Sequence, residues 1–465
     1  MQTTKTAILV NPLNFKKISF ENSPLEIFSK LNKKYATAYL LESIEGPQKL
    51  TQYSFIGFDP RLTIKIKNGK AITRNQKNGD ETTENITDPL TAIKQAITGR
   101  ASANKEFRFA GGAVGYISYD AVRYWEKLPQ NSRDDLNFPD VEMGVFDDGL
   151  VFDHKQKRAY YYYYCENRLS EIEKLAKQPA EAEVLSFSQP KVNITKERYE
   201  KGVEKVKEYV TQGDIFQAVL SKRYDFNFEG DLTAFYRALR MINPSPYMYF
   251  FKAGERQIVG SSPEMLARVE NRTVETFPIA GTRPCTANAV ENRRLAKELL
   301  SDPKERAEHV MLVDLARNDV GRIAKFGSVR VPEFMQVSRY SHVQHIVSRV
   351  VGDLKEEYGS YDALKAVFPA GTVSGAPKVR AMEIIDELEP TRRGPYAGAV
   401  GYFAYNGNAD FAITIRTLFA EKNHAYIQAG AGIVADSVPE SEWFETEHKA
   451  GALMKALQAS GGETR

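Results

Sequence analysis

The chain has 465 residues, of which 42% are hydrophobic and 26% charged, and its 63 basic and 60 acidic side chains leave a net charge of +3. This near-neutral balance argues against nucleic acid as a partner. The first apolar run, Ala7 to Val10, stops at Asn11-Pro12 and is too short for a signal peptide or a membrane span. We therefore expect a cytoplasmic globular protein that binds neither nucleic acid nor a membrane.

The first part of the chain predicts antiparallel β-structure. Apolar and polar residues alternate over Arg61–Lys67, and Asn68-Gly69 is a type I′ turn signal that leads into a second strand at Lys70–Thr73. The stretch from Gln76 to Asp88 is almost entirely polar, which predicts a solvated and mobile loop. The tyrosines of 160–164 follow a strand-and-turn pattern, so we interpret them as a strand and not as a platform for stacked bases.

A polar connector containing Pro179 and Pro190 divides the chain into two regions. Directly after it, apolar residues recur at helical spacing from Thr195, a possible N-cap, to Gly213, a C-terminal stop. We expect residues 1–190 to form an N-terminal region and residues 195–460 a C-terminal region, and the two regions to form one intertwined globule.

Two helices of the C-terminal region carry glutamates that suit a metal ion. The helix predicted over 302–314 begins with a capping aspartate and a proline and carries Glu308, and the helix that starts near Pro439 carries Glu445 and Lys449 on one face. Two glutamates on different helices suit a Mg²⁺ that keeps several waters and takes another oxygen from an anionic substrate. Partners of the helix dipole and an exposed salt-bridge stripe are the open alternatives.

The stretch after Gly394 predicts a meander of antiparallel strands. Strands are expected over 399–405, 410–420 and 424–429, separated by short turns. The hexapeptide Gly111–Tyr116 is echoed by Ala397–Tyr402, which indicates two related strands in a pseudo-repeated sheet.

Two glycine-bearing segments offer backbone amides to an anion. Gln428–Val434 looks like a dinucleotide loop only superficially, because no βαβ unit surrounds it. Pro278–Arg283 adds a hydroxyl to such a turn, and a purely structural turn is the alternative. His345 lies in an apolar stretch, where a packed or hydrogen-bonded histidine is the alternative to a functional one.

Six segments that occur in order resemble the chorismate-binding enzyme family: Gly213–Gln217, Ser261–Glu264, Pro278–Arg283, Arg306–Asp319, Gly371–Lys378 and Gln428–Glu445. Their joint occurrence makes the resemblance specific, and it covers about Thr195 to Leu457. It implies an α/β (α+β) sandwich of two facing, largely antiparallel sheets with helices outside. It also makes 195–460 the catalytic region.

The resemblance implies roles for individual residues. Glu264 would be the general acid, His345 would assist a later elimination, and Gln217 stands where other branches of the family have a lysine that activates water. The implied Mg²⁺ ligands are Glu308 and Glu445. The positions implied to hold chorismate are Gly281, Thr282, Tyr396, Arg416, Gly430, Ala431, Gly432 and Lys449.

By the same resemblance, the expected reaction replaces a hydroxyl of chorismate with ammonia and expels pyruvate, which forms the tryptophan precursor anthranilate. Gly213–Ser221 resembles the anthranilate-forming branch, and Ala280 is compatible with it. The branch that makes aminodeoxychorismate and retains the enolpyruvyl group is the alternative among enzymes. A non-catalytic subunit that senses chorismate or tryptophan is the alternative outside them.

Two features concern partners and regulation. No Gly-x-Cys-x-Gly turn is present for a glutaminase nucleophile, so a separate glutamine amidotransferase subunit is the implied source of ammonia. Leu40–Ser43 and Asn243–Met248 resemble the two halves of a feedback site for tryptophan, which would couple the two regions of the chain. The implied contacts to this inhibitor come from Ser43, Pro246, Tyr247 and Met248.

Overall fold

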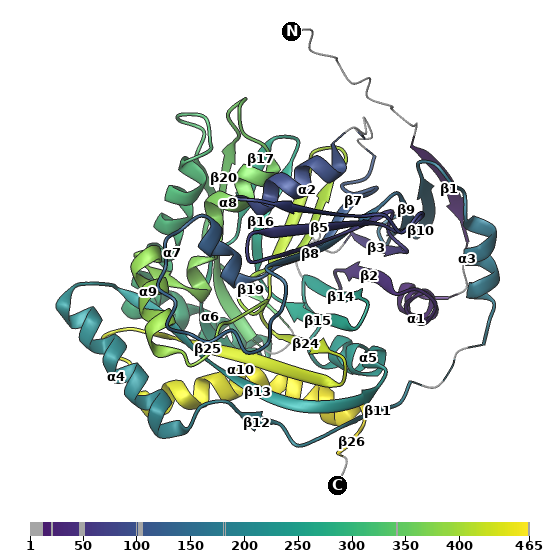
Figure 1. Cartoon of the computed structure of the whole chain (residues 1–465). Helices are drawn as coiled ribbons and strands as arrows, with labels where there is room; N and C mark the ends of the chain where they lie inside the picture. The colour runs from purple at the N-terminus through teal and green to yellow at the C-terminus, as the bar shows by residue number, and fades with distance from the viewer. Residues whose placement is uncertain are drawn as a thin grey trace.

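The computed structural model describes residues 13–19, 22–45, 52–98, 100, 106–179, 181, 183–340 and 343–463, so the apolar run Ala7 to Val10 lies outside the described residues. Two large sheets surrounded by helices build the fold (Figure 1). No helix in these ranges is both long and apolar enough to cross a membrane.

The first sheet contains fourteen of the described strands. Its main path runs in the spatial order β1 (Asn14–Ile18), β10 (Arg158–Tyr163), β9 (Asp148–Asp153), β3 (Tyr53–Phe58), β2 (Thr37–Glu42), β14 (Tyr247–Ala253), β15 (Arg256–Ser262), β24 (Thr417–Glu421), β25 (His424–Ile433), β13 (Gln217–Gly230), β11 (Leu185–Phe187) and β26 (Gly462–Glu463). Two short strands also pair with β13, namely β12 (Lys191–Val192) and β21 (Gly375–Ala376). Only β11 and β26 pair in parallel among these described strands.

The second sheet contains twelve described strands, all antiparallel to their neighbours. Its spatial order is β18 (Ile279–Pro284), β20 (Val343–Asp353), β17 (Thr273–Thr276), β16 (Met265–Glu270), β23 (Ala409–Ile413), β22 (Ala399–Ala404), β7 (Gly112–Ile117), β8 (Val141–Phe146), β4 (Leu62–Lys67), β5 (Lys70–Asn75) and β6 (Glu81–Asn85), with β19 (Arg330–Arg339) beside β20. Both sheets therefore combine strands from the two halves of the chain.

The main hydrophobic core lies between the two sheets. Side chains alternate along a strand, so Tyr39 of β2 and Tyr249 of β14 join this core, while Leu40 and Phe250 point to the opposite face of the first sheet. From the second sheet, Tyr402 joins the same core. The expected sandwich of two facing, largely antiparallel sheets is therefore confirmed.

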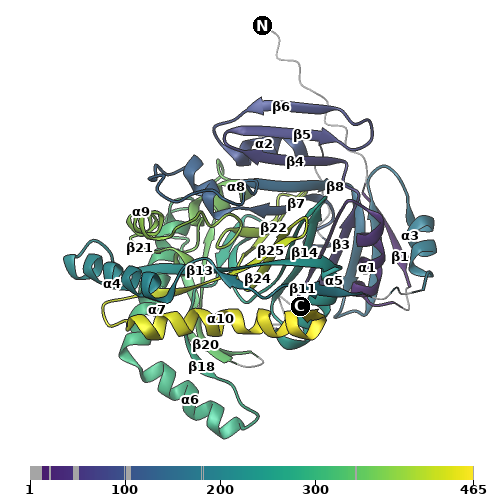
Figure 2. The same ribbon diagram turned by 60° about the horizontal axis from the view of Figure 1, so that its bottom comes forward.

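The helices lie outside this sandwich. They are α1 (Pro24–Lys34), α2 (Pro89–Ile97), α3 (Leu169–Ala176), α4 (Lys196–Gln212), α5 (Leu232–Ile242), α6 (Ala289–Ser301), α7 (Pro303–Gly321), α8 (Ser360–Val367), α9 (Lys378–Leu388) and α10 (Pro439–Ser460), with the 3₁₀ turns η1 (Tyr119–Tyr124) and η2 (Gly371–Val373). Helices α1, α5 and α10 cover the outer face of the first sheet, and α7 and α8 pack on the second. Figure 2 shows α10 running along the first sheet, beside β13 and β25.

Local sequence signals account for several of these elements. Asn68 and Gly69 have φ values of 49° and 75° and close the β4–β5 hairpin as predicted. Helix α4 begins at the N-cap Thr195 and stops at Gly213, whose φ is 84°. The tyrosine run 160–164 provides most of β10, and α7 begins after the capping Asp302.

Two expectations about strands are wrong. The polar stretch 76–88 is not simply a loop, because Glu81–Asn85 form β6 at the edge of the second sheet (Figure 2). All of β6 is exposed, so no apolar residue marks it as a strand. The strand expected over 410–420 is two strands, because the chain leaves the second sheet after β23 and enters the first at β24. The expected continuous meander is therefore divided between the sheets.

The repeated hexapeptides form neighbouring strands. Gly111–Tyr116 supplies most of β7 and Ala397–Tyr402 supplies part of β22, and these strands pair antiparallel with Gly115 opposite Gly401. A Cβ atom on Gly401 would lie 2.0 Å from the backbone oxygen of Asp410 on β23. Glycine is thus needed there for close strand packing.

Replacing Gly401 with alanine is expected to lower the free energy of unfolding by about 2 kcal/mol, because the strand backbone cannot move away without disturbing its pairing. Gly451→Ala on α10 is the control, since no atom lies within 4 Å of the added Cβ and alanine favours a helix. Urea unfolding of both variants tests this difference. Equal stability of Gly401→Ala and the wild type would contradict it.

Candidate active site

Two of the points at which the chain crosses between the sheets are adjacent, and candidate residues lie at both. Glu264 lies between β15 of the first sheet and β16 of the second, and Arg416 lies between β23 and β24. The amide of Ser261 donates to the carbonyl oxygen of Arg416 at 3.0 Å, and the amide of Ile413 donates to that of Glu264 at 3.1 Å. The crossings thus hold each other side by side.

Glu264 is buried and its carboxyl has one polar partner among the described residues. The hydroxyl of Thr372 in η2 donates to Glu264 Oε1 at 2.9 Å. Burial raises the pKa of Glu264 to about 8, against the smaller lowering effects of that hydrogen bond and of the positive charge of Lys449. At neutral pH this carboxyl is therefore mostly protonated and can donate a proton.

Arg416 and Lys449 place two positive charges beside the glycine strand β25. Arg416 Nη1 donates to the carbonyl oxygen of Lys449 at 2.7 Å, and Lys449 Nζ donates to that of Gly430 at 3.0 Å. Burial lowers the pKa of the Arg416 guanidinium, which within the described residues has no carboxylate at ion-pair distance. This half-buried cation suits an anionic substrate.

The glycines of β25 keep one face of the strand open. A Cβ added to Gly430 would lie 2.9 Å from the hydroxyl of Tyr396, and one added to Gly432 would lie 2.4 Å from Nε2 of Gln217. Both of these side chains are buried, and Oε1 of Gln217 has no hydrogen-bond partner in the described part of the chain. Ala431 points to the other face, into the core with α4 and α9, so only its backbone can face a ligand.

His345 on β20 and the turn within β18 belong to the same neighbourhood. His345 Nδ1 lies 2.7 Å from the carbonyl oxygen of Gly281 and 3.2 Å from Oγ1 of Thr282. Because a carbonyl only accepts, Nδ1 carries the proton and Nε2 has the free lone pair. Burial lowers the pKa of His345, and Arg416 and Lys449 lower it further, although the Gly281 contact raises it. The neutral ring can therefore accept a proton.

Glu308 of α7 lies near the glutamates of α10. Burial raises the pKa of Glu308, and the negative charges of Glu305 and Glu445 raise it further. Glu308 has no hydrogen bond or ion pair to any described residue, whereas Glu445 Oε1 lies 2.7 Å from Lys449 Nζ. The described residues contain no cluster of three or more His, Cys, Asp or Glu side chains suited to a metal. Two carboxylates with excess negative charge still fit a Mg²⁺ that keeps water ligands.

The residues of the expected inhibitor site form a separate group. Met248 of β14 is the register partner of Glu42 of β2, and the amide of Ile44 donates to the carbonyl oxygen of Ser245 at 3.3 Å. The two stretches that hold Ser43, Pro246, Tyr247 and Met248 are therefore adjacent. The hydroxyl of Ser43 is buried without a hydrogen-bond partner among described atoms, so it is available to a ligand.

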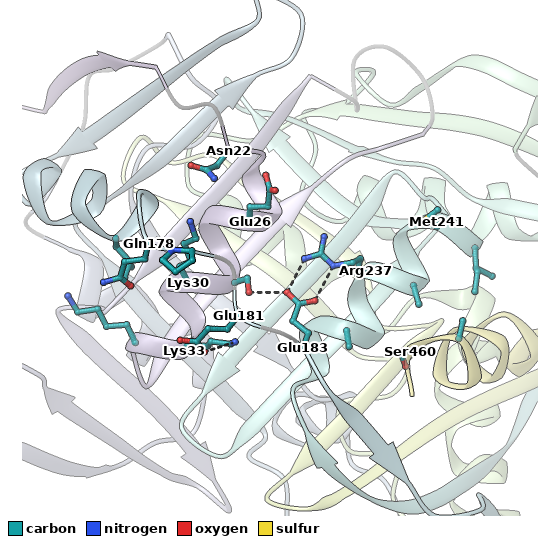
Figure 3. Close-up of a pocket in the computed structure, with 18 residues that line it drawn as sticks. Asn22, Glu26, Lys30, Lys33, Gln178, Glu181, Glu183, Arg237, Met241 and Ser460 are labelled. Carbon is teal, nitrogen blue, oxygen red and sulfur yellow. Dashed lines mark hydrogen bonds and ion pairs between the residues drawn. The ribbon is translucent and has the colours of Figure 1, made fainter. Parts of the chain in front are cut away.

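A large cavity lies elsewhere. It measures about 1040 Å³ and lies between α1, α5 and the end of α10, with Figure 3 showing Arg237 and Lys33 directed toward glutamates. Arg237 pairs with Glu183 at 2.9 Å and Lys33 with Glu181 at 3.1 Å. These two ion pairs compensate four of the charges that line the cavity.

Sequence reasoning missed Thr372, and it placed Glu442 on one helical face with Glu445 and Lys449 without giving it a role. Thr372 contacts the carboxyl of Glu264, and Glu442 of α10 adds a buried carboxylate whose Oε2 has no partner among described atoms. Thr372 lies within the motif Gly371–Lys378, which was the available signal, but nothing in its spacing indicates the contact. Glu442 shares a helical face with Glu445 and was distinguishable only by its burial.

The sequence matches the family described as chorismate binding enzyme over residues 36–455. The chain therefore belongs to the chorismate-binding enzyme family. It is 49% identical to anthranilate synthase component 1 of Methanothermobacter thermautotrophicus, with 97% of this chain and 96% of that protein covered. It is also 43% identical to aminodeoxychorismate synthase component 1 of Bacillus subtilis, with 97% and 98% covered.

Solved structures of related proteins have the same fold. Anthranilate synthase component I from Streptococcus pneumoniae superposes with a TM-score of 0.77 at 39% identity, covering 88% of this chain and 93% of that one. The menaquinone-specific isochorismate synthase MenF of Escherichia coli superposes with a TM-score of 0.73 at 18% identity, covering 97% and 95%. The second likeness concerns the fold alone.

Proposed function

We propose that this enzyme forms anthranilate and pyruvate from chorismate and ammonia, as the first committed step of tryptophan synthesis. The observation that carries the proposal is the buried Glu264, whose pKa burial raises to about 8. It is held where the chain crosses between sheets, beside Arg416, which has no carboxylate partner among the described residues. The similarity to anthranilate synthase component 1 over nearly the whole chain supports this choice of product.

The binding of chorismate follows from its two carboxylates. Arg416 and Lys449 supply positive charge, and backbone amides at Gly430, Gly432 and the Gly281–Thr282 turn supply further donors. Tyr396 closes the site over Gly430. Together these groups offset a dianion whose burial would otherwise be costly.

Glu264 and His345 divide the proton transfers between them. As ammonia attacks the ring, Glu264 donates its proton to the departing hydroxyl, which leaves as water. In the elimination, Nε2 of His345 takes a ring proton while the bond between the ring and the enolpyruvyl oxygen breaks, and the released enolpyruvate gains a proton at its methylene carbon to become pyruvate. Gln217 has an amide where a base would be needed to activate water, so ammonia and not water is the nucleophile in this proposal.

The proposal includes a Mg²⁺ ion, which Glu308 and Glu445 would hold. When bound, it would supply positive charge for a carboxylate of the substrate. The carboxylate of Glu308, which has no partner among the described residues, and the negative charge of Glu445 nearby support a cation at this place.

A glutamine amidotransferase subunit is the proposed source of ammonia, and the cytoplasm the proposed location. Neither cysteine of the chain, Cys165 or Cys285, lies in a nucleophile turn. With ammonium salts the chain alone is therefore expected to turn over chorismate.

Product analysis tests the proposal. Purified chain is incubated with chorismate, Mg²⁺ and ammonium at mildly alkaline pH, and products are separated by chromatography. Anthranilate and pyruvate in equal amounts are expected. Aminodeoxychorismate without pyruvate would establish the second candidate, which the 43% identity to the Bacillus subtilis enzyme favours. Absence of any product would instead favour a sensing subunit.

Tryptophan at millimolar concentration is expected to inhibit this reaction, because Ser43 and the stretch at Pro246–Met248 are adjacent and the buried hydroxyl of Ser43 has no hydrogen-bond partner among the described residues. Initial rates measured with and without tryptophan test the prediction. Ser43→Ala is expected to require at least about tenfold more tryptophan for the same inhibition, since a buried ligand group loses its hydrogen bond. Equal initial rates with and without tryptophan would exclude a feedback site here.

A further inference from the structure

Arg393 is among the largest fully buried side chains of the protein and has no place in the chemistry described above. It lies just after α9, where its Nε and Nη2 bind both oxygens of Glu389 at 2.9 and 2.6 Å. Its remaining hydrogen bonds go to backbone oxygens: Nη1 donates to Val373 at 2.7 Å and Nη2 to Val219 at 2.6 Å. One guanidinium thus links α9, η2 and β13.

The contact with Val373 connects Arg393 to the general acid. Val373 follows Thr372 in η2, and the Thr372 hydroxyl is the polar partner of Glu264 at 2.9 Å. The amide of Val219 on β13 donates to the carbonyl oxygen of Ser374, so the turn is held to this strand from two directions. Glu389 is fixed in turn by the amide and hydroxyl of Ser221, each at 2.8 Å.

We propose that Arg393 is a positioning residue, which holds η2 against β13 so that Thr372 keeps the carboxyl of Glu264 aimed at the substrate. The guanidinium fork suits this task, because it serves one carboxylate and two carbonyl oxygens in fixed directions. A lysine ammonium in its place cannot span these acceptors. The inference rests on the proposed function, in which Glu264 delivers the proton.

The experiment is a double-mutant cycle between Arg393→Lys and Thr372→Val. Each single variant is expected to lower kcat by about 10²-fold and to leave KM for chorismate within about threefold. Because both act through the same contact, the double variant is expected to be no slower than the slower single variant. Thr372→Ser, which retains the hydroxyl, is expected to retain most of the wild-type kcat.

The pH profile adds a readout that loss of packing would not reproduce. The groups facing Glu264 are Thr372, Lys449 and Tyr340, with Asp319 across a cavity of about 40 Å³. The Thr372 hydrogen bond lowers the pKa of Glu264, so its loss raises that pKa. Both single variants should therefore shift the alkaline limb of activity to higher pH.

Arg223→Lys is the matched control. Arg223 is also buried on β13 and pairs with Asp135 at 2.6 Å and Asp225 at 2.9 Å, without contact to η2. It is expected to leave kcat within about twofold and the pH profile unchanged. Thermal unfolding of each variant checks folding, and Glu389→Gln replaces Arg393→Lys if the latter does not fold, with the same shift expected.

Three results would overturn the inference: additive losses in the cycle, an unshifted alkaline limb, or a rise in KM alone. A rise in KM alone would indicate that Arg393 supports substrate binding through Tyr396, whose ring centroid lies 5.7 Å from the guanidinium carbon. Infrared titration of the Glu264 carboxyl, taken as a difference spectrum against Glu264→Gln, needs no turnover. If the wild type shows no turnover, the proposed function is rejected. The positioning role is still tested, because Arg393→Lys should shift the pKa of the Glu264 carboxyl in this titration.

Discussion

Glu264→Gln is expected to lower kcat for anthranilate formation by about 10²–10⁴-fold, which is the usual contribution of a positioned general acid. Glutamine preserves the shape of the side chain and an oxygen to accept from Thr372, but it has no acidic proton for the departing hydroxyl. KM for chorismate should stay within about threefold. Fluorescence of the product gives both constants, and a variant that retains a tenth of wild-type kcat would remove Glu264 from this role.

The pH dependence of the wild type follows from the same group. Glu264 must be protonated to act, and its pKa is raised to about 8 by burial. Activity limited by this group is therefore expected to be retained toward neutral pH and to fall as the pH rises through about 8. The residual activity of Glu264→Gln should lack this alkaline limb. If the loss of activity at alkaline pH persists in Glu264→Gln, the ionisation of another group causes it.

The raised pKa of Glu264 should also make the stability of the folded protein depend on pH. Because the pKa of Glu264 is higher in the folded protein than its ordinary value of 4.5, protonation favours the folded state at low pH, and this contribution is lost as the pH rises through about 8. Glu264→Gln cannot ionise. Its melting temperature relative to the wild type is therefore expected to be higher at pH 9 than at pH 5.

Glu308→Ala and Glu445→Ala are each expected to lower turnover by about 10³-fold or more, because each would remove a ligand of the proposed Mg²⁺. Neither change should unfold the protein, since both side chains lie at a site and not in the packed core. The controls are exposed acids on the same two helices, Asp314→Ala on α7 and Glu440→Ala on α10. Full activity in either ligand variant would refute the metal assignment.

Melting temperatures test this metal site without turnover. Mg²⁺ is expected to raise the melting temperature of the wild type, since a ligand that binds the folded state stabilises it, but not that of Glu308→Ala or Glu445→Ala. Without Mg²⁺, Glu308→Gln should be more stable than the wild type at neutral pH. The reason is that burial and the charges of Glu305 and Glu445 disfavour the ionised carboxylate. Mg²⁺ stabilising all variants equally would place the ion elsewhere.

Much of the local structure was predictable because its causes are local. Thr195 and Gly213 delimit α4, and Asn68-Gly69 closes a hairpin, through the conformations of neighbouring residues alone. The strand β6 was missed because a two-sided exposed strand carries no hydrophobic alternation. The change of sheet between β23 and β24 was missed because each strand alone satisfies the same pattern.

By itself, the sequence determined the family, through motifs whose order is specific, and it determined the helix ends and turns that depend on adjacent residues. Only the tertiary structure decided that Glu264 is buried with Thr372 and that Arg416 has no carboxylate partner in the described chain. It also decided that Arg393 joins three distant segments. The physical reason is that protonation, charge pairing and side-chain direction depend on burial and on neighbours far away in the chain.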